Sequence, residues 1–502
     1  MGVIARQSIR GALANYLGVA IGFFVQFFIV TRYLKPEEIG LTRVLVDAAM
    51  LFSSLAQLGA NSSIVRFFPY FKDGRNNRGI FGLSVLLPLA GFVLFSLAFL
   101  IFREPLLTLY SEKSPLLADY FYMVPMLTFF ALYMTVFETN ASVLLRITVP
   151  KLVHEVGIRL FTLAAYLLYG FGLISLDVFV WLFCGSYGLA MVLNLLYLLS
   201  LGRISFRVDR HFLTRGKRRE IVRYTFFMTA VVLAGNIPLI NSLFLGAKAG
   251  LALTGVYTIA SYIANVVEVP YRSLGAISRP VIATAVKEEQ WGEVNRLCRQ
   301  VSLHQLLVSL LIFYIIWINI DALFAVIPNG REYVGGVGVV FVLGLAKVVN
   351  SSLSVGTDIL NYSRHYPWAL VFITVLTASA IVFNNTLITT MGISGAAMAT
   401  LCAYGLYYAL LHGYLWRKLK VSVFSMGQLK MLVLMALLLA IDMGWDWLFG
   451  AVQQGSIVSV VARATLKTAV LGALAAGGVL LWKVSPTVNE MVARVKTRGP
   501  KL

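Results

Sequence analysis

The sequence predicts an all-α polytopic membrane protein with about 14 transmembrane helices. Of its 502 residues, 59% are hydrophobic and only 13% are charged, and the mean hydropathy is +0.82. A single soluble core could not bury that much apolar surface. Apolar runs of about 20 residues recur along the whole chain. Between these runs, Lys and Arg concentrate in alternate loops, as they do in multi-pass membrane proteins.

The apolar runs each have the length that a helix needs to cross a bilayer. The loops that join them are short, so they leave no room for a soluble catalytic domain. The first run lacks a small-residue cleavage site, so we expect it to remain as the first span. The expected spans are 11–30, 40–60, 80–102, 118–139, 154–173, 178–200, 222–244, 252–277, 301–325, 336–360, 366–385, 393–416, 429–448 and 458–482.

The most charged stretch, residues 203–223, lies between two hydrophobic halves of the chain. If it and both termini are cytoplasmic, the cytoplasmic loops and tails hold about 30 Lys and Arg and the outer loops about 6. The formal net charge of +20 therefore sits in loops. It indicates contact with anionic membrane lipid, and the lipid-soluble flanks argue against a nucleic-acid-binding protein.

A faint internal repeat relates the two halves. Residues 33–44 and 244–256 have similar sequences, so that Gly40 corresponds to Gly255. Six spans separate the two segments, and parallel repeats of this kind share one orientation in the membrane. The predicted domains are an N-terminal six-helix lobe at 1–200, a basic connector at 201–221, a C-terminal six-helix lobe at 222–416, and two further helices with a basic tail at 417–502.

The span at 336–360 carries one polar face. Its residues recur at helical spacing, and they include Lys347, Asn350, Ser354 and Asp358. Lys347 is expected near the middle of the membrane, where an unpaired charge costs about 2.5–3.5 kcal/mol. It therefore needs a carboxylate from another helix, an aqueous cavity or an anionic ligand. A structural ion pair and a substrate site both fit this pattern.

Two further spans carry polar faces, and the repeat places them at matching positions. Their polar residues include Ser261, Asn265, Glu268 and Arg272 in one span, and Arg43 and Asp47 in the other. Arg43–Asp47 and Glu268–Arg272 are each four residues apart, which is the spacing of a helical ion pair. Both arginines are near helix ends, where snorkelling to the interface is an alternative role.

Three other spans contain features that a transporter could use. The first span has Asn15 and Gln26 on a face of small residues, suited to close helix packing or to a wet cavity. The fifth begins with a charged ladder that ends at Arg159, and an interfacial salt bridge is an equal alternative. Pro238 should kink or break the seventh span.

The two last helices carry one charge each at similar depth, Asp442 and Arg463. Either charge alone would be costly in lipid, so we expect the two to face each other.

The sequence lacks the patterns of several enzymes. The Gly216-Lys217 pair is followed by arginine, so there is no P-loop. Histidines and cysteines form no metal-ligand spacing. We therefore expect no catalytic residues, no metal site and no cofactor. The three cysteines indicate no disulfide framework.

In its ordered motifs, the chain resembles the polysaccharide flippases, the Wzx-type exporters of O-antigen and lipopolysaccharide in the multidrug/oligosaccharidyl-lipid/polysaccharide superfamily. The resemblance is carried by RYLKPEEIGLTRVL, HEVGIRLFTLAAYLLYGFGLISLDVFV, TGVYTIASYIANVVEVPYRSLGAISRP and MGISGAAMATLCAYGLYYALL. It implies two six-helix lobes in a V around a central cavity, plus helices 13 and 14. It also implies a bacterial inner-membrane protein that moves an undecaprenyl-diphosphate-linked oligosaccharide between leaflets by alternating access.

With that cargo, the polar residues acquire expected roles. Cations of the cavity would meet the diphosphate, and these are Lys347, Arg272, Arg159 and Arg43. Neutral groups would meet the sugars, and these are Asn350, Ser354, Asn265, Ser261, Asn15 and Gln26. Carboxylates would couple transport to H⁺ or Na⁺, and these are Asp47, Glu268 and Asp358. The expected partners are the lipid-linked oligosaccharide, membrane lipids and polysaccharide-assembly proteins.

Two alternatives stay open at this stage. A lipid II flippase shares the 14 spans and the diphosphate. A drug/cation antiporter of the same superfamily would have about 12 spans and an acid-dominated cavity, which Lys347 disfavours.

The loop charges generate a topology prediction. Cysteines introduced at Arg215 and at Gln454 should react with impermeant thiol reagents from opposite sides of the membrane. Accessibility of both positions from the same side would contradict the predicted topology.

Overall fold

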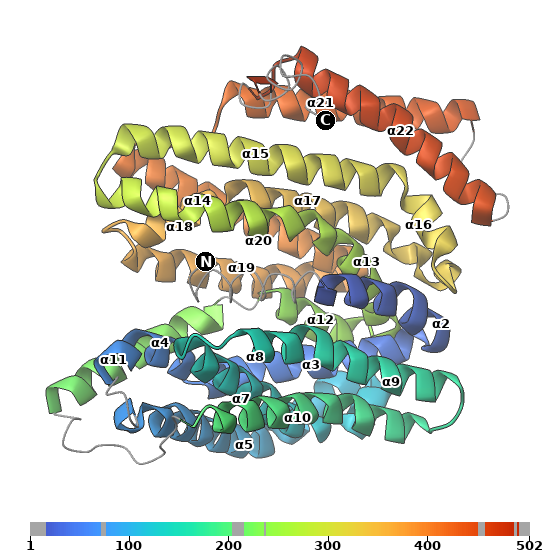
Figure 1. The fold of residues 1–502 in the computed structure, drawn as a ribbon. Coiled ribbons are helices and arrows are strands. Elements are labelled where there is room, and N and C mark those ends of the chain that lie inside the picture. The colour runs from blue at the N-terminus through green and yellow to red at the C-terminus, as the bar shows by residue number, and fades with distance from the viewer. Residues whose placement is uncertain are drawn as a thin grey trace, which may run out of the picture. The chain divides into compact units, whose positions relative to one another are not determined.

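A computed structural model shows a chain built of helices (Figure 1). It describes residues 17–71, 77–202, 215–234, 237–449, 457–485 and 489–490, and this part of the chain contains no β-strand. Asn15 and residues 203–214 of the basic connector lie outside the described residues.

The chain divides into two compact units, Met1–Thr258 and Ile259–Leu502. The first holds η1 (Val25–Val30), α2 (Thr31–Tyr33), α3 (Pro36–Ala56), α4 (Ala60–Phe71), η2 (Asn77–Gly79), α5 (Ile80–Ser111), α6 (Pro115–Tyr120), α7 (Met123–Val143), α8 (Thr148–Leu152), η3 (Val153–Gly157), α9 (Ile158–Gly170), α10 (Leu176–Ser200), α11 (Arg215–Ala234), α12 (Ile237–Lys248) and the start of α13 (Leu251–Asn265).

The second unit continues from α13. It holds η4 (Val266–Glu268), α14 (Val269–Lys287), α15 (Trp291–Ile318), α16 (Ile320–Val326), η5 (Gly330–Gly336), α17 (Val337–Leu353), α18 (Val355–Tyr362), α19 (Pro367–Met391), α20 (Ile393–Leu419), α21 (Met426–Phe449) and α22 (Ile457–Leu481). The V-shaped arrangement and the lobe boundaries from the sequence stay predictions.

Among the described residues, 11 helical segments are long and apolar enough to cross a membrane. The other three predicted spans are also helical. They correspond to Leu17–Tyr33, to α7 and to the divided pair α11 and α12. Each predicted span therefore has a helical counterpart, and the all-α multi-pass class is confirmed.

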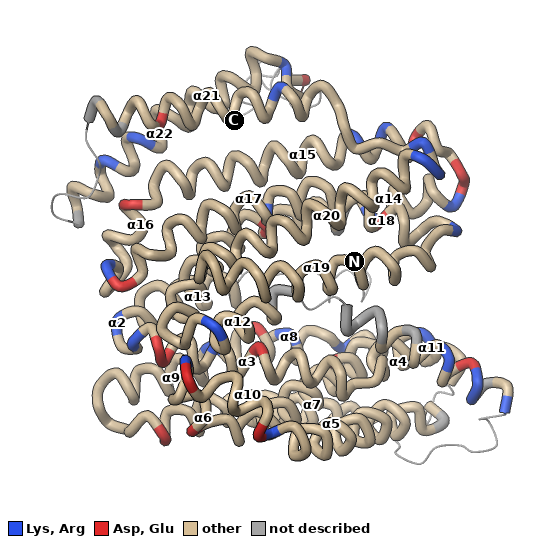
Figure 2. The backbone as a smooth tube through the Cα atoms, turned by 180° about the vertical axis from the view of Figure 1, so that it is seen from behind, with Lys and Arg blue, Asp and Glu red and all other residues tan. Residues whose placement is uncertain are grey.

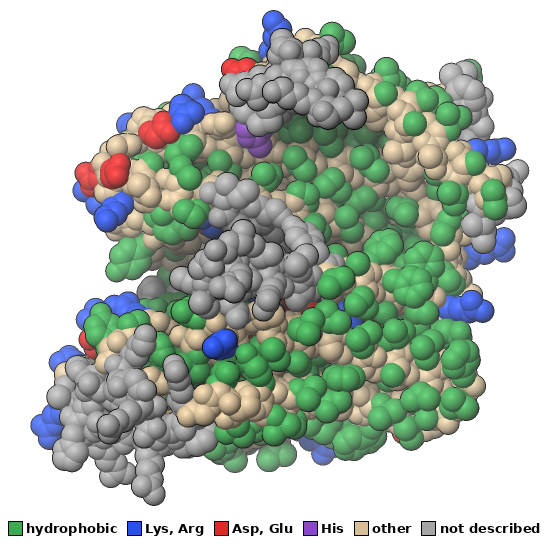
Figure 3. All heavy atoms as spheres, in the orientation of Figure 1, with side chains coloured by type: hydrophobic (Ala, Val, Ile, Leu, Met, Phe, Trp, Pro, Cys, Tyr) green, Lys and Arg blue, Asp and Glu red, His purple; other side chains and the backbone are tan. Residues whose placement is uncertain are grey.

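The distribution of side chains is that of a protein solvated by lipid. Charged residues gather at the ends of the helices, and few lie along their middles (Figure 2). Hydrophobic side chains cover much of the surface (Figure 3). On α5, for example, Leu100 and Ile101 are 68% and 72% exposed. An exposed apolar surface of this extent is stable in a bilayer and not in water.

Several predicted spans are interrupted helices. The first interruption, expected at Pro238, stays a prediction, because residues 235 and 236 between α11 and α12 lie outside the described residues. A second interruption, which the sequence analysis missed, is the 3₁₀ turn η4, followed by Pro270 as the second residue of α14. Proline is tolerated there because the first turn of a helix needs no donor from its backbone nitrogen. A third interruption divides α17 from α18 at Ser354.

The two glycines that the repeat relates meet in the first unit. A Cβ on Gly40 would overlap the carbonyl oxygen of Leu251, and a Cβ on Gly255 would overlap that of Pro36. Leu251 lies four residues before Gly255, and Pro36 lies four residues before Gly40. The contact is therefore reciprocal, as expected of related segments that pack about a local two-fold axis. Only glycine allows the two backbones to approach so closely.

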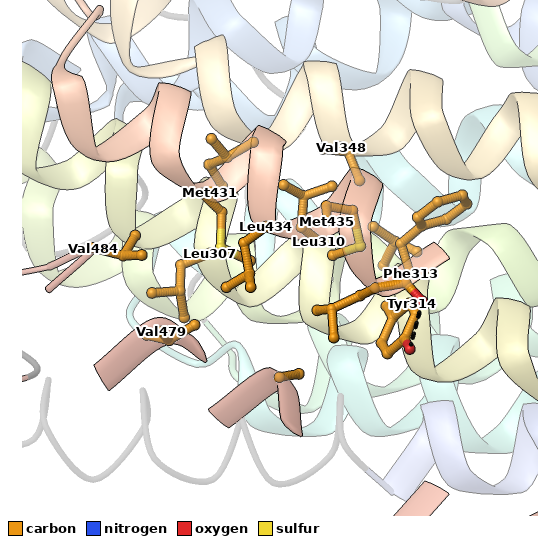
Figure 4. Close-up of a cluster of buried hydrophobic side chains, with 14 of the residues drawn as sticks. Leu307, Leu310, Phe313, Tyr314, Val348, Met431, Leu434, Met435, Val479 and Val484 are labelled. Carbon is orange, nitrogen blue, oxygen red and sulfur yellow. Dashed lines mark hydrogen bonds between the residues drawn. The ribbon is translucent and has the colours of Figure 1, made fainter. Parts of the chain in front are cut away.

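Helices α21 and α22 belong to the second unit, where they pack along α15 (Figure 4). Their shared core contains Leu310 and Phe313 of α15, Met435 of α21 and Val479 of α22. The hydroxyl of Tyr314 on α15 donates to the carbonyl of Leu438 at 3.2 Å.

The reciprocal glycine contact generates a stability prediction. Gly40→Ala and Gly255→Ala should each lower the free energy of unfolding by about 1–3 kcal/mol, because the added methyl forces two helices apart. Thermal unfolding of the purified protein measures the loss. Gly185→Ala on α10 is the control, since nothing lies within 4 Å of its added Cβ. Equal stability of all three variants would contradict the packing argument.

Candidate functional site

The second unit holds a buried ion pair between two interrupted spans. Lys347 of α17 places its Nζ 3.2 Å from Oε2 of Glu268 in η4. The two side chains are 10% and 14% exposed. Of the partners that the sequence allowed for Lys347, the structure therefore provides a carboxylate from another helix. The expected pairing of Glu268 with Arg272 stays a prediction, because the side chain of Arg272 lies outside the described residues.

The interruptions explain why this carboxylate can lie between helices. Glu268 ends the 3₁₀ turn that separates α13 from α14. Lys347 lies on α17, which ends at Leu353 before α18 begins. Interrupted spans in transporters bring polar side chains and free backbone groups together in the membrane interior.

Two further side chains complete the surroundings of Glu268: Asn350 of α17 and Tyr408 of α20. Asn350, one turn along α17, donates through Nδ2 to Oε1 of Glu268 at 2.8 Å. Its own Oδ1 accepts a hydrogen bond from the hydroxyl of Tyr408 on α20 at 2.7 Å. Both carboxylate oxygens of Glu268 thus have donors. The sequence analysis missed Tyr408 because nothing in a tyrosine-rich apolar helix marks the one that faces the polar network.

A second ion pair in the same unit involves Asp358. This carboxylate lies 3.2 Å from Nε of Arg279. The same guanidinium donates through Nη2 to the hydroxyl of Tyr271 at 2.9 Å. Arg279 follows the predicted span 252–277 and lies on α14, which continues to Lys287 with Pro280 inside it.

The remaining predicted polar residues have more ordinary surroundings. Ser354 is buried, and its hydroxyl donates to the carbonyl of Ser351. Ser261 and Gln26 are half-buried, and Asn265 is exposed. Asn350 is the predicted polar residue whose hydrogen bond joins it to the Lys347–Glu268 pair.

In the first unit, Asp47 is almost fully buried. Its Oδ2 lies 2.6 Å from Nε of Arg43, which confirms the predicted pair four residues apart on α3. The same oxygen accepts a hydrogen bond from Ser242 of α12 at 2.5 Å. The ion pair is thus fixed to the helix that packs beside it.

Arg159 lies near the start of α9, directly after the π-helical segment η3, and α9 packs against the π-helical segment η1 of the first span. Its Nη2 is 3.4 Å from Oε2 of Glu155 in η3. The guanidinium packs against Gly18 and Gly22, where a Cβ would collide with it. Lys151, the first residue of the predicted ladder, instead pairs with Glu138 of α7 at 3.8 Å. π-helical segments of this kind occur frequently at functional sites.

The predicted Asp442–Arg463 pair is wrong. Asp442 lies 2.7 Å from Nζ of Lys467, and both side chains are less than 10% exposed. Arg463 is exposed, one turn earlier on the same helix. The prediction matched the depth of the charges but ignored the helix face. Lys467, and not Arg463, lies on the face of α22 that packs inside the second unit.

The described residues contain no group of three or more His, Cys, Asp or Glu side chains placed to hold a metal ion. The chemistry available is therefore ionic: carboxylate–cation pairs lie within the helical spans of both units, and a further pair joins the last two helices.

Sequence and structure comparisons agree with this architecture. The polysaccharide biosynthesis protein family matches residues 7–286 of the chain. Among curated proteins, none has a significant match to it. A lipid II flippase MurJ in an inward closed conformation is 12% identical with a TM-score of 0.68, over 93% of this chain and 98% of that one.

Two multidrug/oligosaccharidyl-lipid/polysaccharide (MOP) superfamily structures are also similar. An inward-facing multidrug resistance MATE family transporter is 16% identical with a TM-score of 0.60, over 84% of this chain and 98% of that one. A MOP superfamily transporter from Pyrococcus furiosus is 14% identical with a TM-score of 0.53, over 83% and 95%. These likenesses show that the fold is that of MurJ and the MATE transporters.

The Lys347–Glu268 geometry generates a prediction for a double-mutant cycle. Lys347→Met should lower the free energy of unfolding by about 3–5 kcal/mol, because it leaves a buried carboxylate without its cation. Lys347→Met combined with Glu268→Leu should regain most of that loss. Thermal unfolding of the purified variants in detergent measures both effects. A double variant no more stable than the single one would show that the two side chains do not depend on each other.

Proposed function

Since the chain belongs to the polysaccharide biosynthesis protein family, we propose that it is a flippase and not an enzyme. It moves an undecaprenyl-diphosphate-linked oligosaccharide, such as an O-antigen repeat unit, from the inner to the outer leaflet by alternating access. In this proposal the protein resides in the bacterial inner membrane with both termini in the cytoplasm. The fold that it shares with MurJ and MATE transporters supports a transport role.

The observation that carries the proposal is the buried cation of Lys347. A diphosphate that crosses the bilayer core needs a positive partner there, because an isolated anion is strongly destabilised in a low dielectric. Lys347 has one anionic partner, Glu268, at 3.2 Å. A diphosphate oxygen could replace that carboxylate at the ammonium group without leaving the lysine unpaired.

Replacement of Glu268 also offers a coupling step. Once Lys347 binds the diphosphate, the neutral Asn350 amide is the donor that Glu268 retains among the described residues. An ionised carboxylate in that position is unstable, so it would take up H⁺ or Na⁺. Release of the lipid would restore the ion pair and expel the ion. Asp47 and Asp358 are less suited to this role, because each already binds an arginine.

The neighbouring hydroxyl and amide groups fit a sugar-bearing cargo. Asn350 and Tyr408 are joined by a hydrogen bond beside the ion pair. Such groups can exchange partners with sugar hydroxyls at little cost. A lipid II flippase would use the same diphosphate contact, and the MurJ likeness in fold keeps it as the alternative. The two differ in the sugar, so a transport assay with both lipids distinguishes them.

The proposal predicts that a folded protein without the cation fails to transport. Lys347→Met with Glu268→Leu should reduce translocation of a fluorescent undecaprenyl-diphosphate oligosaccharide in proteoliposomes at least about thirtyfold, equivalent to ~2 kcal/mol. Lys347→Arg should retain part of the activity, since it keeps the charge but not the shape.

A matched control is available in the last two helices. Lys467→Met with Asp442→Leu removes another buried ion pair of the same unit, at 2.7 Å. This variant should keep normal translocation. Normal translocation by the Lys347 and Glu268 double variant would overturn the assignment. Transport of lipid II in preference to the oligosaccharide lipid would instead favour the alternative.

A further inference from the structure

The second unit has a largely apolar groove along α20. The groove encloses about 540 Å³. Its walls come from α17, α20 and the segment that precedes α21. The lining residues are Leu353, Gly405, Tyr408, Ala409, His412, Gly413, Trp416, Ser422, Val423 and Phe424.

The floor of the groove is made of small residues. Gly405, Ala409 and Gly413 are four residues apart, so they lie on one face of α20. All three are exposed, and nothing lies within 4 Å of a Cβ built on either glycine. From Gly405 to Trp416 the helix rises roughly 16 Å. The floor is thus an open, apolar track about half as long as the hydrocarbon layer is thick.

One end of the track is cationic and aromatic. Trp416 and Phe424 are exposed there, at 59% and 67%. Arg417, Lys418 and Lys420 follow directly and are also exposed. Aromatic rings next to basic residues are typical of the boundary between hydrocarbon and headgroups. The predicted topology places this end in the cytoplasmic leaflet.

The other end of the track meets the ion-pair network. Tyr408 lines the groove and donates its hydroxyl to Asn350, which binds Glu268. His412 lines the groove as well and donates Nε2–H to the carbonyl of Leu353 at 2.9 Å. Its ring stacks beside that of Tyr408, with centroids 6.1 Å apart. A lipid in the groove would therefore contact the side chains that hold the Lys347–Glu268 pair.

We propose that this groove is a loading site for the lipid carrier: the polyprenyl chain lies on the track of α20, and its diphosphate lies over the cations that follow Trp416. The proposal rests on the proposed flippase function. Three cations match a diphosphate better than the single negative charge of phosphatidylglycerol. A track one helix face wide fits a single isoprenoid chain better than two acyl chains.

The experiment is photo-crosslinking of the purified full-length protein in phosphatidylcholine nanodiscs. The probe is undecaprenyl diphosphate with a diazirine in its chain, and mass spectrometry identifies the labelled peptides. Labels should concentrate on residues 405–424. Unlabelled undecaprenyl diphosphate should compete for the site, whereas phosphatidylglycerol at the same concentration should not. Equal competition by both lipids would overturn the proposal in favour of a general anionic-lipid site.

Substitutions that fill the track test its role without threatening the fold. Gly405→Leu and Gly413→Leu place side chains in open space and improve helix propensity. Each should reduce crosslinking at least about tenfold, because the chain loses its track along α20. Gly472→Leu on α22 is the matched control, since nothing lies within 4 Å of its added Cβ either. Unchanged crosslinking in the filled variants would contradict the groove as the binding site.

The cationic end is tested separately. Arg417→Gln and Lys418→Gln should each weaken binding of the probe about fivefold, and the loss should shrink at high salt. Undecaprenol, which lacks the diphosphate, should be insensitive to both. Equal loss for the alcohol would overturn the placement of the diphosphate.

Failure of this proposal is distinct from failure of the proposed function. If the protein translocates the oligosaccharide lipid but no label appears in 405–424, the loading site alone is wrong. If labels appear there and filling the track abolishes them, while no lipid-linked sugar is translocated, the flippase assignment is wrong and the binding site stands.

Discussion

The constraint on which the polar interior depends is the cost of charge in a low dielectric. Four carboxylates of the helical spans have a cation within 3.4 Å: Asp47 has Arg43, Glu155 has Arg159, Glu268 has Lys347, and Asp358 has Arg279. None of these charges could remain in the bilayer alone. The two pairs that join different helices lie beside interruptions: Glu268 ends η4, and Asp358 follows the break at Ser354. A side chain from one helix reaches a partner on the next most easily where a span is interrupted.

Sequence reasoning recovered the helices because their signal is local. Length and hydropathy located each span. It also recovered Arg43–Asp47, a pair within one helix. It could not assign Glu268 to Lys347, because that contact joins residues 79 apart in the chain. The same limit explains the wrong partner for Asp442: depth can be read from the sequence, but the packed face of a helix depends on its neighbours.

The repeat illustrates how weak sequence similarity can carry structural information. Gly40 and Gly255 were related only by two short, faintly similar segments. In the structure each glycine packs against the carbonyl four residues before the other. Gly170 of α9, by contrast, packs against the ring of Tyr33, and no repeat marked it. Backbone-to-backbone contact demands glycine on both sides, so it preserves a symmetrical pattern. Contact between a backbone and a side chain requires glycine at only one of the two positions.

The four cation–carboxylate pairs of the interior are not equivalent as exchange sites. Arginine holds a carboxylate with a rigid fork of donors, and Arg43 and Arg279 each have such a partner. Lysine is a point charge with rotatable donors, so it can pass from one anion to another with little rearrangement. Lys467 also has an exchangeable ammonium group, but its side chain is buried where α22 packs against α21 and α15. Lys347 alone among these combines an exchangeable charge with two interrupted spans, and Asn350 and Tyr408 connect it to the groove along α20.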